Sequence, residues 1–359
     1  MATTSIIASE ERSDRGQFIC VCPGAMGRKS MKINYLALSA LSLAMSAAAA
    51  DAREIRLGHA STETNPRHDA ALFFADKVEE LSGGEMTVSV ASNAQLGDDA
   101  EMMTALRLGT LDMSISSQGA MASIIEEATV VGLPFLFDSA DAAWSVMDGE
   151  VGDMLTERAA EKGVIVLGYW DNGIRLITNN VRPIVEPADL QGLKIRIPSD
   201  PMANDIFSTL GANPVPIPFA ETYVALQQGV ADGQENPAVN IESQKFQEVQ
   251  DYVALSYHKW EFLPLLASKV TWAQLSDEEK GWLSEAAAAA TEYQRSNANK
   301  ANEASLAIIS KAAEVSEIDT AAFREATAPV YDKWRGKYGD FVDALIAQSQ
   351  AYSSGAVSQ

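Results

Sequence analysis

Two arginines stand inside short apolar segments that alternate like β-strands, where a charged side chain is unusual. Arg196 lies in LKIRIPSDP between Ile195 and Ile197, and Arg175 lies in DNGIRLITNN. Because side chains alternate along a strand, Arg196 is expected on the face opposite the two isoleucines. A guanidinium there requires an anion, and its planar fork matches a carboxylate through two parallel hydrogen bonds. The anion is either a bound ligand or an internal Asp or Glu side chain, and the spacing alone favours neither strongly.

The familiar catalytic motifs are missing from the sequence. It contains no glycine-rich phosphate loop, no HExxH, no GxSxG and no EF-hand loop. Histidine occurs only at His59, His68 and His258, and this spacing does not indicate a metal site. Carboxylates are abundant, but no pair stands out as a general acid and base. We therefore expect no catalytic residues, no metal and no other cofactor.

The charge balance argues against several classes of partner. The chain has 49 Asp and Glu against 27 Lys and Arg, a formal net charge of -22. Such a charge repels nucleic acid and anionic lipid, so we expect neither as a partner. It says little about a small ligand, because one buried cation can bind an anion inside an acidic protein. The composition, 47% hydrophobic and 21% charged, is that of an ordinary globular protein.

The N-terminal part is predicted to be removed from the folded protein. Arg28, Lys29 and Lys32 precede the apolar, small-residue run INYLALSALSLAMSAAAA, an order typical of a secretory signal peptide. We assign the signal peptide to residues 31–52. A membrane anchor is the alternative, but the run is short, rich in Ala and Ser, and lacks stop-transfer charges.

Residues 1–30 read as a separate leader. They show no apolar period and precede a second methionine, so Met31, or alternatively Met26, is expected to be the true start. Both cysteines, Cys20 and Cys22, lie in this leader. A chain cleaved after the signal peptide would therefore form no disulfide, thiolate metal site or cysteine nucleophile.

Strand-like and helical segments alternate after the predicted cleavage site. The pattern predicts strands over 54–60, 86–92 and 111–117, with helices over 66–81 and 97–109 between them. This βαβαβ order implies an open α/β sheet, in which ligands gather at the carboxyl ends of the strands. A chain of 359 residues is long enough for two domains.

The second half of the chain supplies the segments around the arginines. Segments 164–170 and 174–180 form a nearly continuous β pair, and we hypothesise that the chain crosses there from one lobe to another. Further strands and helices follow over 193–229, and long helices are predicted over 276–313 and 320–348. No Pro/Ser-rich linker is present, so we expect the chain to cross between lobes several times.

Five segments closely resemble the solute-binding subunits of TRAP transporters, the DctP family. The segments are QLGDDAEM (95–102), DNGIRLITNN (171–180), DLQGLKIRIPSDP (189–201), GANPVPIPFAETYVALQQGVADGQENP (211–237) and QKFQEVQDY (244–252). The likeness spans the chain after the signal peptide, and the block from LKIRIP to DGQENP is highly specific.

The resemblance implies an α/β periplasmic binding protein with two lobes. Each lobe would be a mixed sheet flanked by helices, with a long helix bridging the two. One lobe would comprise 53–172 and 261–300, and the other 173–260 and 301–354.

The resemblance also implies roles for single residues. Arg196 would clamp the carboxylate of the ligand and Arg175 would support it, with Phe219 and Asn236 beside them. A plain core aromatic is the alternative for Phe219, and a turn cap before Pro237 is the alternative for Asn236.

Weaker expectations concern the rest of the ligand. Further contacts are expected from Asn65, Ser117, Gln118, Asp98, His59 and Trp170. Asp98 or Asp99 would reach ligand hydroxyls or, equally, pair with the dipole of the helix they begin. Trp170 and Trp260 would stack on a sugar-like ring or fill the hinge. Sialic-acid-binding members carry an acid where Ser117 stands, so sialic acid is not expected.

The expected function is capture and delivery without catalysis. The resemblance implies a monomer that binds a small organic acid and hands it to the small and large membrane subunits of a TRAP transporter. The polar candidates favour a hydroxylated carboxylate such as a uronate, with a C4-type dicarboxylate or a sulfonate as alternatives. A secreted lyase or hydrolase acting on a sugar acid, and a structural or adhesive protein, are the remoter alternatives.

Overall fold

The computed structural model describes residues 52–353. The predicted leader, all but the last residue of the predicted signal peptide, and both cysteines lie outside the described residues. Within 52–353, no helix combines the length and the apolar character needed to cross a bilayer.

The first sheet has five strands and contains the predicted βαβαβ unit. Helices α1 (Pro66–Ser82) and α2 (Asp99–Leu108) connect its three parallel strands, as the sequence pattern predicts. Strand β10 then pairs antiparallel with β3 and β4. In spatial order the strands are β2 (Met86–Ala91), β1 (Arg53–His59), β3 (Met113–Ile115), β10 (Trp260–Ser268) and β4 (Val164–Ile174).

The second sheet has six strands and carries Arg196. In spatial order they are β11 (Glu314–Glu317), β9 (Tyr252–Leu255), β5 (Leu176–Asn179), β8 (Gly233–Asn236), β6 (Lys194–Ile197) and β7 (Asn213–Pro216). Strand β7 lies at the edge and includes Pro214 and Pro216, which an edge position tolerates because proline has no N–H to donate. The flanking helices are α6 (Pro201–Thr209), α7 (Thr222–Gln227) and α8 (Ala238–Ser243).

The chain crosses between the sheets at the β4–β5 pair. Strand β4 belongs to the first sheet and β5 to the second, and Arg175 is the single residue between them. The chain therefore passes from one sheet to the other at this β pair. A second crossing runs from β9 to β10, next to the first, because the backbone N–H of Arg175 donates to the carbonyl of Lys259 over 2.9 Å.

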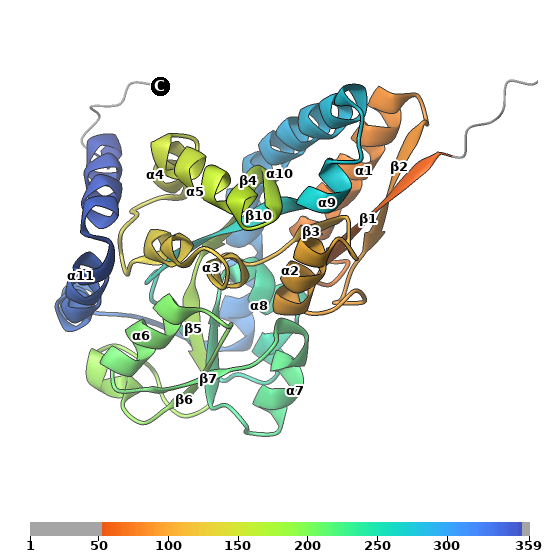
Figure 1. Ribbon diagram of the computed structural model, residues 1–359. Helices are drawn as coiled ribbons and strands as arrows, with labels where there is room; N and C mark the ends of the chain where they lie inside the picture. Colours follow the sequence, from red (N-terminus) through yellow and green to blue (C-terminus); the bar gives the residue numbers. More distant parts are fainter. Residues whose placement is uncertain (1–51, 354–359) are drawn as a thin grey trace, which may run out of the picture. The chain divides into compact units, whose positions relative to one another are not determined.

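Helix α10 (Asp277–Ala312) packs on elements of both sheets. It lies against α1 and β4 of the first sheet and against α8 beside the second (Figure 1). Its start is fixed by a capping box in which Ser276 and Glu279 satisfy each other's backbone N–H groups. Helix α11 (Thr320–Ser353) packs on α4 (Ala140–Met147) and α6, and its helical geometry breaks at Tyr338. Both long helices agree with the sequence prediction.

The segment between β3 and β4 was not assigned from the sequence and is mostly helical. It contains α3 (Gln118–Ala122), η1 (Glu126–Gly132), α4 and α5 (Glu150–Glu161). The remaining short helices are η2 (Pro187–Leu190), η3 (Phe219–Glu221), η4 (Phe246–Glu248) and α9 (Lys269–Trp272).

The core of the first sheet fixes the strands that lead to the cleft. Leu57, Phe74 and Trp170 are fully buried between the sheet and helices α1 and α10. Burying each such side chain contributes on the order of 2 kcal/mol. The indole N–H of Trp170 donates to Thr291 Oγ1 on α10 over 3.1 Å, which anchors the helix to strand β4.

Candidate ligand-binding site

A cavity of about 60 Å³ lies between the two sheets, at the carboxyl ends of their strands. The first sheet contributes Ala60, which follows β1, and Ser117, which follows β3. The second sheet contributes Ser199, which follows β6, and Asn236 at the end of β8. The cavity therefore lies at the edge of the sheets where open α/β sheets bind ligands.

Arg196 reaches this cavity from the end of β6 with one edge of its guanidinium free. The side chain is 1% exposed, and its Nε and Nη2 both donate to the carbonyl of Ile217, over 2.9 and 2.6 Å. Within residues 52–353 it makes no ion pair, and burial lowers its pKa to about 10. The side chain therefore stays cationic at neutral pH, and the Nη1–Nη2 edge matches a carboxylate.

Arg175, by contrast, is paired with carboxylates of the protein itself. It lies at the β4–β5 crossing, where its Nε and Nη2 bind the Glu235 carboxylate and its Nη1 binds Glu261. All three side chains are buried. Burial works against ionised Glu235, but the charge of Arg175 and a hydrogen bond from His258 prevail and lower its pKa to about 2. The charge of Arg175 is thus used to hold the β4–β5 crossing to β8 and β10, whereas Arg196 has no such counterion.

A second buried ion pair continues this network. Lys259, at the β9–β10 crossing, pairs with Asp200 at the start of α6, and its Nζ lies 3.9 Å from Glu261 Oε1. Burial alone would lower the pKa of Lys259. The negative charges of Asp200 and Glu261 outweigh this effect, so the pKa is raised overall. The crossings at β4–β5 and β9–β10 are therefore tied together by a buried network of two cations, Arg175 and Lys259, and three carboxylates.

The start of helix α2 separates the roles of its two aspartates. Asp98 is the N-cap, and its Oδ1 accepts from the backbone N–H groups of Ala100 and Glu101, over 2.9 and 2.8 Å. Asp99 Oδ2 accepts from the backbone N–H of Ser117 over 3.1 Å. Both aspartates line the cavity. Helix capping thus accounts for Asp98, whereas Asp99 keeps an oxygen without a partner.

The two sides of the cavity touch at its rim. Asn65, the N-cap of α1, donates through Nδ2 to Asn240 Oδ1 on α8 over 2.9 Å. At another point Gly119 on α3 approaches the loop after β6 so closely that an added Cβ would lie 2.8 Å from the carbonyl oxygen of Ser199. Glycine is required there for the two sides to meet.

The chain matches one family model over most of its length. The model of bacterial extracellular solute-binding protein, family 7 (DctP), matches residues 57–337. The chain belongs to this family.

Similar proteins support this assignment. The protein y4mM of Sinorhizobium fredii is 44% identical over 287 residues, which are 79% of this family 7 chain but only 53% of y4mM. The galactonate complex of the sugar acid binding protein DctPAm from Advenella mimigardefordensis is 36% identical, with a TM-score of 0.81 over 83% of this chain and 98% of that one. A TRAP periplasmic solute-binding protein from Sulfurospirillum deleyianum with bound succinate is 35% identical. Its TM-score is 0.79 over 83% of this chain and 98% of that one.

Several of the predicted site residues meet at the cavity of this family 7 protein, and others do not. Those that line it are Arg196, Arg175, Asn236, Phe219, Ser117 and Asp98. Asn65, Gln118, His59 and Trp170 lie outside its walls. Gln118 is buried and donates to the carbonyl of Ala128, and His59 shares a hydrogen bond with His68 over 3.0 Å.

The tryptophans and His258 are also occupied elsewhere. Trp170 binds Thr291 in the core, and the indole N–H of Trp260 donates to Asp171 Oδ1 over 2.5 Å. His258 Nδ1 shares a hydrogen bond with Ser256 Oγ over 2.8 Å. Of the two alternatives for the tryptophans, hinge packing is the one that these contacts fit.

Five polar residues of the cavity were missed by the sequence prediction. They are Arg67, Asn172, Ser199, Asn240 and Glu261. Ser199 lies just past the carboxyl end of a predicted strand, and Arg67 lies in the first turn of the helix predicted after another, so their position was a usable signal. Asn172 and Glu261 lie inside strands that cross between the sheets, and only the three-dimensional pairing of β4 with β10 brings them to the cavity.

Asp171, next to Asn172 in β4, is expected to make the stability of the binding protein depend on pH. Burial raises its pKa from 3.8 to about 6, against a hydrogen bond from Trp260 that lowers it. Folding therefore favours the protonated carboxyl. This contribution, roughly 2–3 kcal/mol, is fully present below about pH 4 and is lost as pH rises through about 6.

The variant Asp171→Asn tests this contribution. Asn cannot ionise and still accepts the hydrogen bond from Trp260. The free energy of unfolding of the variant should therefore not fall in this way, and it should rise relative to that of the wild type between about pH 4 and pH 7. Urea unfolding of both proteins across this range measures the difference. Two pH profiles that run parallel would show that Asp171 does not titrate as described.

Proposed function

We propose that this protein is the periplasmic solute-binding subunit of a TRAP transporter and that it captures a small organic acid through Arg196. The observation that carries the proposal is a buried guanidinium in the cavity with a free edge and no ion pair within residues 52–353. A desolvated charge without a counterion is costly, so the site is poised for an anion.

Polar neighbours of Arg196 support a carboxylate with hydroxyl groups as the ligand. Asn236, Asn240 and Ser199 line the cavity together with Asn172. Phe219 also lines it, with its ring 6.0 Å from the Arg196 guanidinium, and it provides an apolar surface for a carbon chain. The bound galactonate of the Advenella protein belongs to this ligand class, whereas the succinate of the Sulfurospirillum protein represents the dicarboxylate alternative.

The lobes that close on this ligand are proposed to follow the two sheets. One lobe comprises 53–172 with 261–300, and the other comprises 173–260 with 301–354. The crossings at β4–β5 and β9–β10 would form the hinge, which the Arg175 network ties together. Closure excludes water, and the Arg196–carboxylate pair strengthens because the effective dielectric falls.

The location and the partners follow from the predicted export signal and the family. Cleavage of residues 31–52 would release the protein into the periplasm. There, ligand binding would shift the protein's equilibrium from the open to the closed form. The closed, liganded form would then dock on the small and large membrane subunits. The ligand is bound and released without chemical change.

A thermal-shift panel tests this function. D-galactonate, D-galacturonate, succinate and a short alkanesulfonate are each added while product formation is followed by mass spectrometry. A ligand at about 100 times its Kd stabilises the folded state by about 2.7 kcal/mol, or about 5–10 °C in Tm. We expect such a shift with a sugar acid and no product. Turnover would identify an enzyme instead. If none of the acids shifted the Tm, the proposed function would be contradicted.

A further inference from the structure

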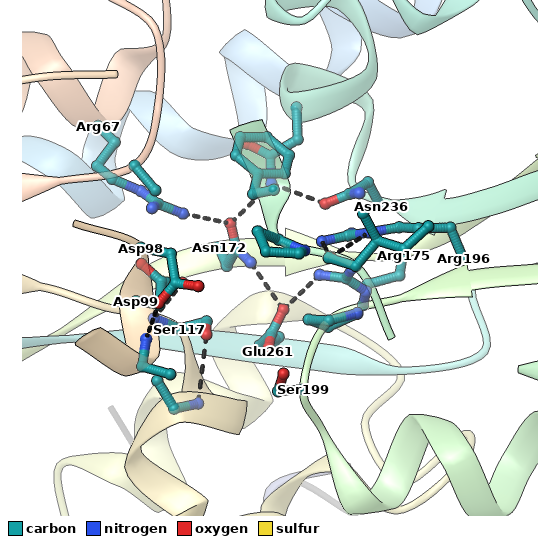
Figure 2. A pocket seen from close by; sticks show the side chains of 18 residues that line it. Arg67, Asp98, Asp99, Ser117, Asn172, Arg175, Arg196, Ser199, Asn236 and Glu261 are labelled. Carbon is teal, nitrogen blue, oxygen red and sulfur yellow. Dashed lines mark hydrogen bonds and ion pairs between the residues drawn. The ribbon is translucent and has the colours of Figure 1, made fainter. Parts of the chain in front are cut away.

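A second and larger cavity lies behind the strand crossing, away from the ligand cavity. We call it the rear cavity. Its volume is about 300 Å³, and its walls come from both proposed lobes and from α10. Asn172 and Arg175 line the ligand cavity (Figure 2), whereas Gly173, Ile174 and Leu176 line the rear cavity. The β4–β5 crossing therefore separates the two cavities and contributes to the walls of both.

Much of the lining of the rear cavity is apolar. The apolar members are Ala140, Ile174, Leu176, Ala238 and Leu306. Tyr257, between β9 and β10, adds an aromatic side chain that is 47% exposed. Its φ of 44° lies in the left-handed region, which a bulky residue rarely adopts. The lining thus offers a surface for the hydrocarbon part of a small molecule and an aromatic ring that attracts cations.

The charged residues of the rear cavity are all acidic. They are Asp141, Asp171 and Glu303, and no Lys, Arg or His among residues 52–353 lines the cavity with them. The exposed side chains of Asp141 and Glu303 make no ion pair with another residue of 52–353. In the ligand cavity, by contrast, three arginines accompany three acidic residues. The rear cavity therefore favours a cation.

Asp171 supplies a buried acceptor that the described part of the chain leaves unused. The residue is 4% exposed, and its Oδ1 accepts from the indole N–H of Trp260. Its Oδ2 has no hydrogen-bond partner among residues 52–353. The indole N–H of Trp144 lies near this carboxyl but also lacks a partner, so it completes no hydrogen bond to Oδ2. A buried acceptor left unsatisfied is costly, and a bound donor would remove this cost.

A bare metal ion fits the rear cavity poorly. Among residues 52–353, no three His, Cys, Asp or Glu side chains are grouped so that they could hold one metal ion. A metal ion would also gain nothing from the apolar lining. A protonated amine on a short hydrocarbon chain suits both features, because its N–H groups donate to carboxylates and its carbon atoms cover apolar surface.

We propose that the rear cavity binds a small organic ammonium ion and that its occupancy stabilises the closed form of the protein. The ammonium group lies beside Asp171 and is attracted by Asp141 and Glu303, while its hydrocarbon part packs on the apolar lining. The site itself goes beyond the proposed function, whereas its coupling to closure rests on that function.

The position of the crossings sets the sign of the coupling. The two lobes touch at the rim of the ligand cavity, where Asn65 donates to Asn240, so the structure represents the closed form. Asp141 of one lobe and Tyr257 of the other both line the rear cavity. Because the crossings lie between the two cavities, a rotation that opens the ligand cavity brings the rear walls together. An ion in the rear cavity opposes this rotation and, by linkage, raises the affinity for the acid.

Isothermal titration calorimetry with 2-phenylethylammonium tests the site. Burial raises the pKa of Asp171 to about 6, so its carboxyl is ionised in the titration buffer at about pH 8. We expect a Kd of about 1 mM or tighter, as for an efficient ligand of this size. The uncharged analogue 2-phenylethanol has the same carbon skeleton and should bind at least about tenfold more weakly.

Two variants locate the site. Asp171→Asn should weaken 2-phenylethylammonium at least about tenfold, because a charge-assisted hydrogen bond is lost. Glu303→Gln changes an exposed residue and should weaken it about two- to fivefold without disturbing the core. The matched control is Glu285→Gln, which removes the same charge from α10 outside the rear cavity and should leave the affinity unchanged.

Titration of D-galactonate with and without saturating 2-phenylethylammonium tests the coupling. We expect galactonate to bind about fivefold tighter or more when the amine is present. Galactonate affinity that is unchanged or weaker would overturn the coupling. Equal affinities for the amine and the alcohol, or an amine affinity that neither Asp171→Asn nor Glu303→Gln lowers, would overturn the site. Binding of the amine without binding of any acid would support the site and contradict the proposed function.

Discussion

Replacing Arg196 by alanine is expected to abolish measurable binding of D-galactonate in calorimetry while the protein stays folded. The substitution removes the buried, unpaired cation of the cavity wall and leaves the ligand carboxylate desolvated without a partner. Truncating one member of a buried charge pair costs about 2–5 kcal/mol, which is about 30- to 5,000-fold in Kd. Folding should persist because Arg196 makes no ion pair within residues 52–353, and far-UV circular dichroism checks this.

The conservative variant Arg196→Lys separates charge from geometry. Lysine keeps the positive charge but cannot make the two parallel hydrogen bonds of a guanidinium, so binding should be weakened and not lost. Galactonate affinity that is undiminished in Arg196→Ala would remove the clamp from the account. Wild-type affinity in Arg196→Lys would show that only the charge matters.

Replacing Arg175 by methionine is expected to damage stability more than any surface change. The substitution leaves Glu235 and Glu261 buried at the hinge without their main counterion. Breaking a buried ion pair on one side costs about 3–5 kcal/mol, because an uncompensated charge stays in the interior. Urea unfolding measures the change in the free energy of unfolding.

A surface pair provides the matched control for Arg175. Arg335 and Asp343 form an ion pair at 2.9 Å with side chains 45% and 61% exposed, so Arg335→Met should cost less than about 1 kcal/mol. Adding Glu235→Gln to Arg175→Met should restore part of the lost stability by removing one stranded charge. Equal costs for the two methionine variants would contradict the structural role of Arg175.

The order of elements could be predicted from the sequence where the period is clear. Strands β1 to β3 and helices α1 and α2 follow from alternation and from capping signals. Strand β10 could not be predicted in this way, because WEFLPLLAS is buried along its whole length and contains Pro264. A continuously apolar strand shows no period of two. Strand β11, EVSE, is a short polar segment whose structure depends on pairing with β9.

The site could be predicted only in part, because pairing is decided by distant residues. The sequence left open whether each arginine binds a ligand or an internal acid. The acids that occupy Arg175 lie 60 and 86 residues away along the chain, and no local pattern reveals them. Arg196 has no such partner within 52–353, and this difference separates two arginines that look alike in sequence.

A crystal structure of the protein with bound D-galactonate tests the central claim most directly. The account predicts that the carboxylate of galactonate lies on the Nη1–Nη2 edge of Arg196 in two parallel hydrogen bonds, with the carbon chain extending toward Arg67. A complex in which the carboxylate binds elsewhere, while the Arg196 guanidinium remains bonded only to the carbonyl of Ile217, would contradict it.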